Sequence, residues 1–188
     1  KLRKIGLAIT DHNVINGSLI ASRQKKVPVI PGVELTAKTG RDILAYFYSF
    51  KDLVAFYSKH IKGKQMKNKL FSLERNMLKQ RDEELIESSR DYNATLVIPH
   101  PYCFPYKYYQ EFYTDSPFLK YMHGVEVLNS AIWPERNLPA LEFAKKLKKG
   151  FVGGSDAHNR LALGRAVTVA RADSIGSFLD AIRKRKTG

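Results

Sequence analysis

The sequence has one cysteine and no long apolar segment. A single thiol, Cys103, excludes an intramolecular disulfide. The longest apolar runs, such as Asp52 to Tyr57 and Thr95 to Ile98, are far too short to span a bilayer. No charged-then-apolar leader precedes the first expected strand, so we expect a cytoplasmic protein without membrane contact. Internal repeats and low-complexity tracts are also absent, which argues against a fibre or a disordered chain.

Basic residues outnumber acidic ones, with 32 lysines and arginines against 18 aspartates and glutamates, a formal net charge of +14. Such a charge can steer an anionic substrate or hold nucleic acid through its phosphates. The lysines are spread from Lys1 to Lys186, and a solubilising surface explains them at least as well. With 188 residues, 44% of them hydrophobic, the chain is expected to form one compact domain over residues 1–188.

Short apolar runs alternate with helical patterns, which is typical of an α/β fold with a parallel sheet and helical crossovers. Strands are expected at 5–9, 27–30, 95–98, 124–128, 151–153 and 166–170, and helices at 17–26, 139–149 and 174–184. The last helix begins after a capping serine, Ser174. Residues 33–36 and 42–47 are expected to pair as an antiparallel hairpin that turns at Gly40.

Residues 51–91 have apolar side chains at helical spacing. Leu53, Phe56 and Tyr57 form one stripe, and a second stripe has members three and four residues apart: Leu70, Leu73, Met77 and Leu78. The polar positions between them have both signs of charge. We therefore interpret 51–91 as a helical insertion with a solvated face.

Histidines and carboxylates recur directly after the expected strands. Because loops after parallel strands gather at one edge of a sheet or barrel, we expect these side chains to lie close together. Imidazole and carboxylate groups together bind zinc, manganese or iron. The candidates that share this position are Asp11, His12, Glu34, His100, Asp156 and His158. His60 and His123 do not share it and are expected at the surface or in the core.

Other residues are weaker candidates. Asn129 ends a strand and can point into the pocket, and Arg160 or Arg165 can hold a phosphate oxygen. Cys103 is either a soft ligand or a small packing residue, and Asp42 is assigned to the hairpin rather than to a metal. An aromatic segment can wall a pocket, stack a base or form a packed lid: Tyr102, Phe104, Tyr106, Lys107, Tyr108, Tyr109, Phe112 and Tyr113.

Five motifs, AITDHN, IPGVELTA, IPHPY, GVEVLNS and GGSDAH, resemble in this order the PHP (polymerase and histidinol phosphatase) superfamily. The final LGRAVTVA, followed by an amphipathic helix, is similar to that family's ending. The resemblance implies a distorted TIM-like (β/α)7 barrel with two or three divalent metal ions. It also implies metal ligation by His12, Glu34, His100, Asp156 and His158. Glu34 would bridge two metal ions, and Asp11 would contact the ligands without binding metal itself.

Two features depart from the family. Members open with a strand that contains an HxH motif whose histidines bind metal, and this sequence has none. We expect that segment upstream of Lys1. Asp42 stands where many members have a histidine after the bridging glutamate, which favours two metal ions over three.

These features together predict a phosphoesterase. We expect a hydroxide held between metal ions to hydrolyse a phosphate ester, most simply a small phosphate monoester. One alternative is a PHP-type nuclease or nucleotide phosphatase acting on nucleic-acid ends, which the +14 charge favours. The other is a non-catalytic accessory module of a larger assembly, although five retained ligands argue against it.

Overall fold

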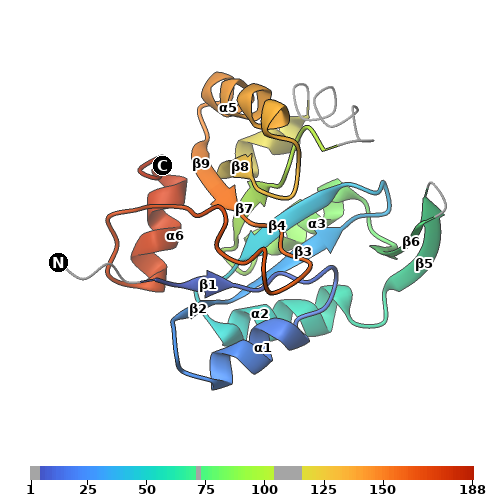
Figure 1. Cartoon of the computed structure of the whole chain (residues 1–188). Coiled ribbons are helices and arrows are strands. Elements are labelled where there is room, and N and C mark those ends of the chain that lie inside the picture. The colour runs from blue at the N-terminus through green and yellow to red at the C-terminus, as the bar shows by residue number, and fades with distance from the viewer. Residues whose placement is uncertain (1–4, 71–72, 104–115) are drawn as a thin grey trace. The chain divides into compact units, whose positions relative to one another are not determined.

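The computed structural model describes residues 5–70, 73–103 and 116–188 (Figure 1). The chain divides into two compact units, Lys1–Leu96 and Val97–Gly188. No helix in the described ranges is long and apolar enough to cross a membrane.

The first unit begins with a strand, a helix and a second strand. β1 (Leu7–Ala8) and β2 (Val29–Ile30) pair in parallel, and α1 (Asn16–Arg23) connects them. β3 (Gly32–Thr36) and β4 (Asp42–Tyr46) then form an antiparallel hairpin. The hairpin turns at Gly40, whose φ of +83° suits glycine. These elements confirm the predicted strands, helix and hairpin of this part of the chain.

The next segment is helical only in part. It contains α2 (Phe50–Phe56), the π-helical turn η1 (Tyr57–Ile61) and α3 (Asp82–Arg90), and between them β5 (Gln65–Leu70) pairs antiparallel with β6 (Leu73–Leu78). The prediction of a helix through Leu70, Leu73, Met77 and Leu78 is therefore wrong.

Tertiary contacts explain why a hairpin forms here. The Gln65 side chain donates to the Asn13 carbonyl, and the Asn76 side chain donates to the His12 carbonyl. Met77 and Leu78 are buried. Helix propensity is a weak preference that such contacts override.

The core of the first unit lies around β3, β4 and the helices α2 and α3. Its fully buried side chains include Leu35, Ile43, Phe47, Leu53, Phe56, Leu85 and Ile86. α2 is capped by Ser49, whose hydroxyl accepts from the Asp52 amide at 3.1 Å. Arg41, beside the hairpin turn, donates to buried Asp82 at the start of α3 at 2.6 Å. This contact ties the hairpin to the core.

The second unit is a parallel sheet with helices. β7 (Thr95–Ile98), β8 (Gly124–Asn129) and β9 (Gly150–Gly154) pair in parallel, and short 3₁₀ turns, η2 (Pro117–Tyr121) and η3 (Pro134–Arg136), precede β8 and the next helix. α5 (Asn137–Lys146) packs along β8, and α6 (Ile175–Arg183) packs against β9 (Figure 1). Ser174 caps α6, as predicted.

One expectation about the fold is corrected. Residues 166–170 form no strand, since their ladder is a single bridge between Ala170 and Thr187. The segment lies beside β9, but the Thr168 side chain makes the contact: its Oγ1 accepts from the Gly153 amide at 2.9 Å and donates to the Gly153 carbonyl at 3.0 Å. Within the described ranges the strands form no closed barrel. The mixed α/β class is confirmed.

Candidate metal-binding sites

The side chains of His12, Glu34 and Asp42 in the first unit converge at the end of the β3–β4 hairpin. Glu34 lies in the middle of β3, and Thr36 pairs with Asp42 at the end of the hairpin ladder. Because side chains alternate along a strand and cross-strand partners share a face, Glu34, Thr36 and Asp42 lie on the same face. His12 reaches this face because its backbone forms a parallel bridge with Glu34.

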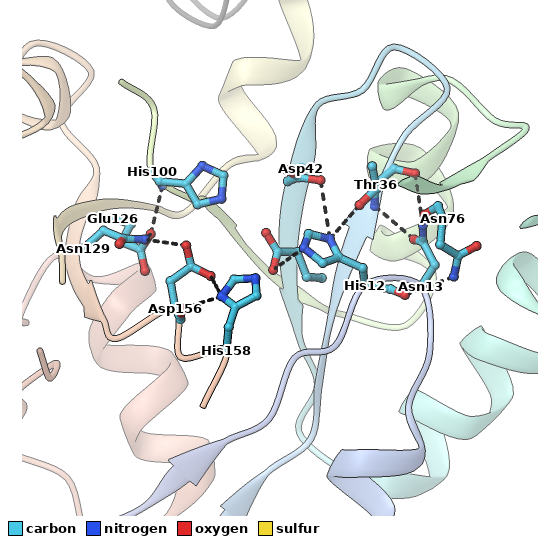
Figure 2. A network of polar contacts seen from close by, with 11 residues as sticks. His12, Asn13, Thr36, Asp42, Asn76, His100, Glu126, Asn129, Asp156 and His158 are labelled. Carbon is cyan, nitrogen blue, oxygen red and sulfur yellow. Dashed lines mark hydrogen bonds and ion pairs between the residues drawn. The ribbon is translucent and has the colours of Figure 1, made fainter. Parts of the chain in front are cut away.

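The distances within this group fit a cation. His12 Nε2 lies 3.8 Å from Glu34 Oε2, and His12 Nδ1 lies 3.7 Å from Asp42 Oδ1 (Figure 2). One ligand atom from each of the three residues lies within 4.8 Å of the others. Glu34 and Asp42 are buried, whereas the His12 side chain is 37% exposed. Two carboxylates and an imidazole at this spacing form a donor set for a divalent transition metal.

A second layer of hydrogen bonds holds His12 in place. His12 Nδ1 shares a 2.8 Å hydrogen bond with Thr36 Oγ1 (Figure 2). When Nδ1 is the donor, the lone pair of Nε2 is directed away from Thr36 and is available to a metal. Asn13 Oδ1 accepts from the Thr36 amide at 2.9 Å, and Asn13 Nδ2 donates to the carbonyls of Thr36 and Asn76. These bonds make the hairpin β5–β6 part of the support for the site.

Asp11 directly precedes His12 in the chain. It is exposed, and its carboxylate lies against the Cα of Gly17 in the first turn of α1. Its backbone carbonyl accepts from the Glu34 amide at 3.4 Å. The supporting role expected for Asp11 stays a prediction.

The second unit holds the other predicted ligands at the ends of its strands. His100 follows β7, and Asp156 and His158 follow β9. His100 and Asp156 both have positive φ angles, +27° and +46°. Non-glycine residues rarely adopt this conformation, and such strained residues are concentrated at functional sites.

Glu126 and Asn129 connect these residues. Glu126 Oε2 accepts from the His100 amide and from Asn129 Nδ2, both at 2.9 Å (Figure 2). Asn129 Nδ2 also donates to Asp156 Oδ2 at 3.3 Å. Burial raises the pKa of the Glu126 carboxyl, and the neighbouring His100 and the bond from Asn129 oppose that rise. The Asn129 side chain therefore bridges the Asp156 carboxylate and the buried Glu126 carboxyl.

The remaining candidates are more exposed. The His158 side chain is 77% exposed, and its Nδ1 lies 3.0 Å from the Asp156 carbonyl oxygen. Arg160 and Arg165 are exposed, and Arg165 Nε donates to the Leu161 carbonyl at 3.1 Å. Within the described ranges, His12, Glu34 and Asp42 form the group of three with metal-ligand spacing, and His100, Asp156 and His158 form none.

Cys103 is partly buried, and its amide donates to the His100 carbonyl at 2.9 Å. Of the predicted aromatic segment, Tyr102 packs edge-on to Phe143, with ring centroids 6.3 Å apart. The rest of that segment, from Phe104 to Tyr113, lies outside the described residues.

Sequence reasoning did not identify two buried acids, Asp42 and Glu126. Asp42 was assigned to the hairpin, which is correct, but its pairing with Thr36 turns the carboxylate toward His12. Glu126 is part of the GVEVLNS motif, but no role was attached to it. The available signal was a lone acid inside an apolar strand, because an acidic side chain is rarely fully buried unless it is paired.

Comparisons with known proteins agree with the motifs. Residues 134–187 match the model of the PHP-associated family. An uncharacterized protein of Methanocaldococcus jannaschii is 36% identical over 87 residues, which are 44% of this chain and 37% of that protein.

Two solved structures share the fold. A two-domain protein from Bacteroides vulgatus, containing a predicted PHP-like metal-dependent phosphoesterase, has a TM-score of 0.58 at 18% identity, covering 97% of this chain and 54% of its own. A lesion-specific endonuclease from Pyrococcus furiosus has a TM-score of 0.59 at 20% identity, covering 85% of this chain and 40% of its own. At these identities the likenesses show the fold alone.

The match of residues 134–187 to the PHP-associated family model agrees with the resemblance of the motifs to the PHP superfamily. The chain spans less than two thirds of the length of each of these relatives.

Proposed function

We propose that this chain is a metal-dependent phosphoesterase whose first metal-binding group is His12, Glu34 and Asp42. The observation that supports it most strongly is the spacing of these three side chains, with ligand atoms within 4.8 Å of one another. Two of the three are buried acids on one face of a hairpin. Burying carboxylates side by side is costly unless a cation compensates them.

His100, Asp156 and His158 of the second unit stay predicted ligands, and the proposal expects two or three ions of zinc, manganese or iron in all. Divalent ions bound at such ligands lower the pKa of coordinated water and offset charge on phosphoryl oxygens. The closed (β/α)7 barrel expected of the family belongs to this proposal.

The chain's own residues have separate tasks in this proposal. Thr36 holds the His12 ring so that Nε2 is available for ligation, and Asn129 holds the Asp156 carboxylate toward the predicted ligands. Arg160 and Arg165 are exposed cations that bind phosphate oxygens of the substrate. Asp11 supports the His12 loop. The reaction class is hydrolysis of a phosphate monoester.

The test is turnover of p-nitrophenyl phosphate by the full-length protein supplied in turn with zinc, manganese or iron. Asp42→Asn keeps the shape of the side chain and removes its charge, and we expect it to lower both metal content and turnover. His123→Gln is the matched control, because His123 is a histidine outside the candidate sites. Full turnover after exhaustive chelation, or an Asp42→Asn variant as active as wild type, would contradict the proposal.

A nuclease is the second candidate, favoured by the net charge of +14. It predicts hydrolysis of single-stranded oligonucleotides that exceeds hydrolysis of the small monoester under the same metal. A protein that binds no metal and cleaves neither substrate would instead favour a non-catalytic accessory module.

A further inference from the structure

The second unit has an open cleft lined mainly by cations. Its volume is about 550 Å³, and it lies between the C-terminal ends of α5 and α6 and the start of β9. Six basic residues contribute to its lining: Lys145, Lys148, Lys149, Lys184, Arg185 and Lys186. Ala144, Phe151 and Thr187 complete it, so no acidic residue lines the cleft.

Acidic neighbours compensate only part of this charge. Lys145 pairs with Glu142 at 2.8 Å, and Lys184 pairs with Asp180 at 3.5 Å. Within the described ranges, Lys148, Arg185 and Lys186 have no ion pair with a carboxylate. Cations near helix C-termini are stabilised by the helix dipole, which accounts for some of them. It does not account for two helices that end at one cleft, each followed by further basic residues.

The backbone shows that cations occupy positions where glycine is usual. Lys148 and Arg185 follow the ends of α5 and α6 with φ angles of +53° and +57°. This left-handed conformation after a helix is normally taken by glycine, because a Cβ strains it. Both helices therefore have a strained basic residue where an uncharged and unstrained one would end the helix equally well.

Lys149 shows that the crowding of charge has a cost. Its Nζ donates to the Leu119 carbonyl at 2.8 Å, and the side chain is partly buried. Burial lowers the pKa of the Lys149 ammonium, and the positive charge of Arg185 lowers it further. An anion in the cleft would relieve this repulsion.

Phe151 gives the cleft an aromatic wall. It is partly exposed and lies at the beginning of β9, where it pairs with Val125. A basic groove combined with an accessible aromatic ring is an arrangement by which proteins bind single-stranded nucleic acid, since the cations follow the phosphates and the ring stacks on a base.

We propose that this basic cleft binds a single-stranded nucleic acid, with its lysines and arginine on successive phosphates and Phe151 stacked on a base. The cations are spread over two segments, 145–149 and 184–186, and are mostly exposed, which suits a chain of phosphates better than one small anion. The site is independent of the proposed hydrolysis. Phe151 lies at the start of β9, whereas Asp156 follows its other end.

The test is fluorescence anisotropy of a labelled single-stranded oligothymidylate with the full-length chain, titrated at several salt concentrations. The triple variant Lys148→Gly, Arg185→Gly, Lys186→Gln removes three cleft cations, and its two glycines relieve backbone strain, so the fold is retained. The matched control, Lys26→Ala, Lys51→Ala, Lys62→Ala, removes the same charge from exposed positions in the first unit.

We expect the cleft variant to bind at least about tenfold more weakly, with its log–log salt slope lowered by roughly 2, at about 0.7 per lost phosphate contact. The surface control should stay within about twofold of wild type. Phe151→Leu keeps the apolar contact but loses stacking, and we expect at least about a fivefold loss. Asp42→Asn should bind the strand like wild type even if all turnover is lost, which separates this proposal from the proposed function.

Three results would overturn the proposal. The first is equal weakening in the cleft variant and the surface control, which would make binding a property of net charge. The second is displacement of the strand by millimolar inorganic phosphate, which would identify a site for a small phosphorylated ligand. The third is tighter binding of a duplex of the same sequence, with no effect of Phe151→Leu.

Discussion

Asn13 connects the His12 loop to β3, and replacing it measures how much of the first unit's stability depends on that connection. Its side chain is fully buried, accepts from the Thr36 amide at 2.9 Å and donates to the carbonyls of Thr36 and Asn76. Its φ is +57°, which asparagine tolerates better than alanine. Asn13→Ala leaves the buried Thr36 amide without its acceptor, at about 1–3 kcal/mol. The left-handed conformation adds about 1 kcal/mol.

We therefore expect Asn13→Ala to lower the free energy of unfolding by roughly 2–4 kcal/mol, a large share of the 5–15 kcal/mol typical of a domain. Asn13→Gly loses the same hydrogen bonds without the backbone strain, so it should be roughly 1 kcal/mol less destabilising than alanine. Asn93 has the same backbone conformation, with φ +51°, but is exposed. Asn93→Ala is the control that reports strain without burial.

The assay is urea unfolding of metal-free protein followed by far-UV circular dichroism. Circular dichroism is required because the single tryptophan, Trp133, lies in the second unit. A loss no larger for Asn13→Ala than for Asn93→Ala would refute the reasoning, since it would mean that the buried hydrogen bonds contribute nothing measurable.

Three further predictions follow from single contacts. Thr36→Val removes the hydroxyl that holds His12 Nδ1, so the metal affinity measured by calorimetry should fall about 10–100-fold. Thr36→Ser keeps the hydroxyl and should keep the wild-type affinity. Equal metal affinities of the two variants would exclude a supporting role for Thr36. His60 has a buried Nε2 without a hydrogen-bond partner in the described ranges and stacks on Phe56, and burial lowers its pKa from 6.5. The unfolded state then binds more protons, so stability should fall as pH drops below about 6.5. In thermal melts at pH 5 to 7, His60→Phe should flatten that dependence. A variant that loses as much stability as wild type at low pH would contradict this. Glu126→Ala removes the acceptor of the His100 backbone amide and one of the two acceptors of Asn129 Nδ2, at about 1–3 kcal/mol each, whereas Glu126→Gln keeps a carbonyl there. Equal losses for the two variants in urea unfolding would argue against these bonds.

Local signals in the sequence were sufficient for much of the fold. The hairpin turn at Gly40 and the capping serine at Ser174 act over a few residues, and the structure has both as predicted. The helix through Leu70 and Met77 was predicted from spacing alone. It was wrong because the segment pairs with itself and contacts the distant His12 loop, and no local pattern encodes such a contact.

The candidate sites were predicted unevenly for the same reason. His12 follows β1 and Glu34 lies within β3, and the structure brings them together with Asp42. Asp42 was not predicted as a partner because its direction depends on the pairing of β4 with β3, and a slip of one residue would turn it to the other face. The ligand roles of His100, Asp156 and His158 stay predictions.

The measurement that tests the central claim most directly is titration of the metal-free, full-length chain with zinc and with manganese, in parallel with the Asp42→Ala variant. The proposal predicts at least one tight ion per wild-type chain, and an affinity at least about 10-fold weaker in the variant. A wild-type chain that binds neither ion, or a variant that binds as tightly as wild type, would contradict a metal site at His12, Glu34 and Asp42.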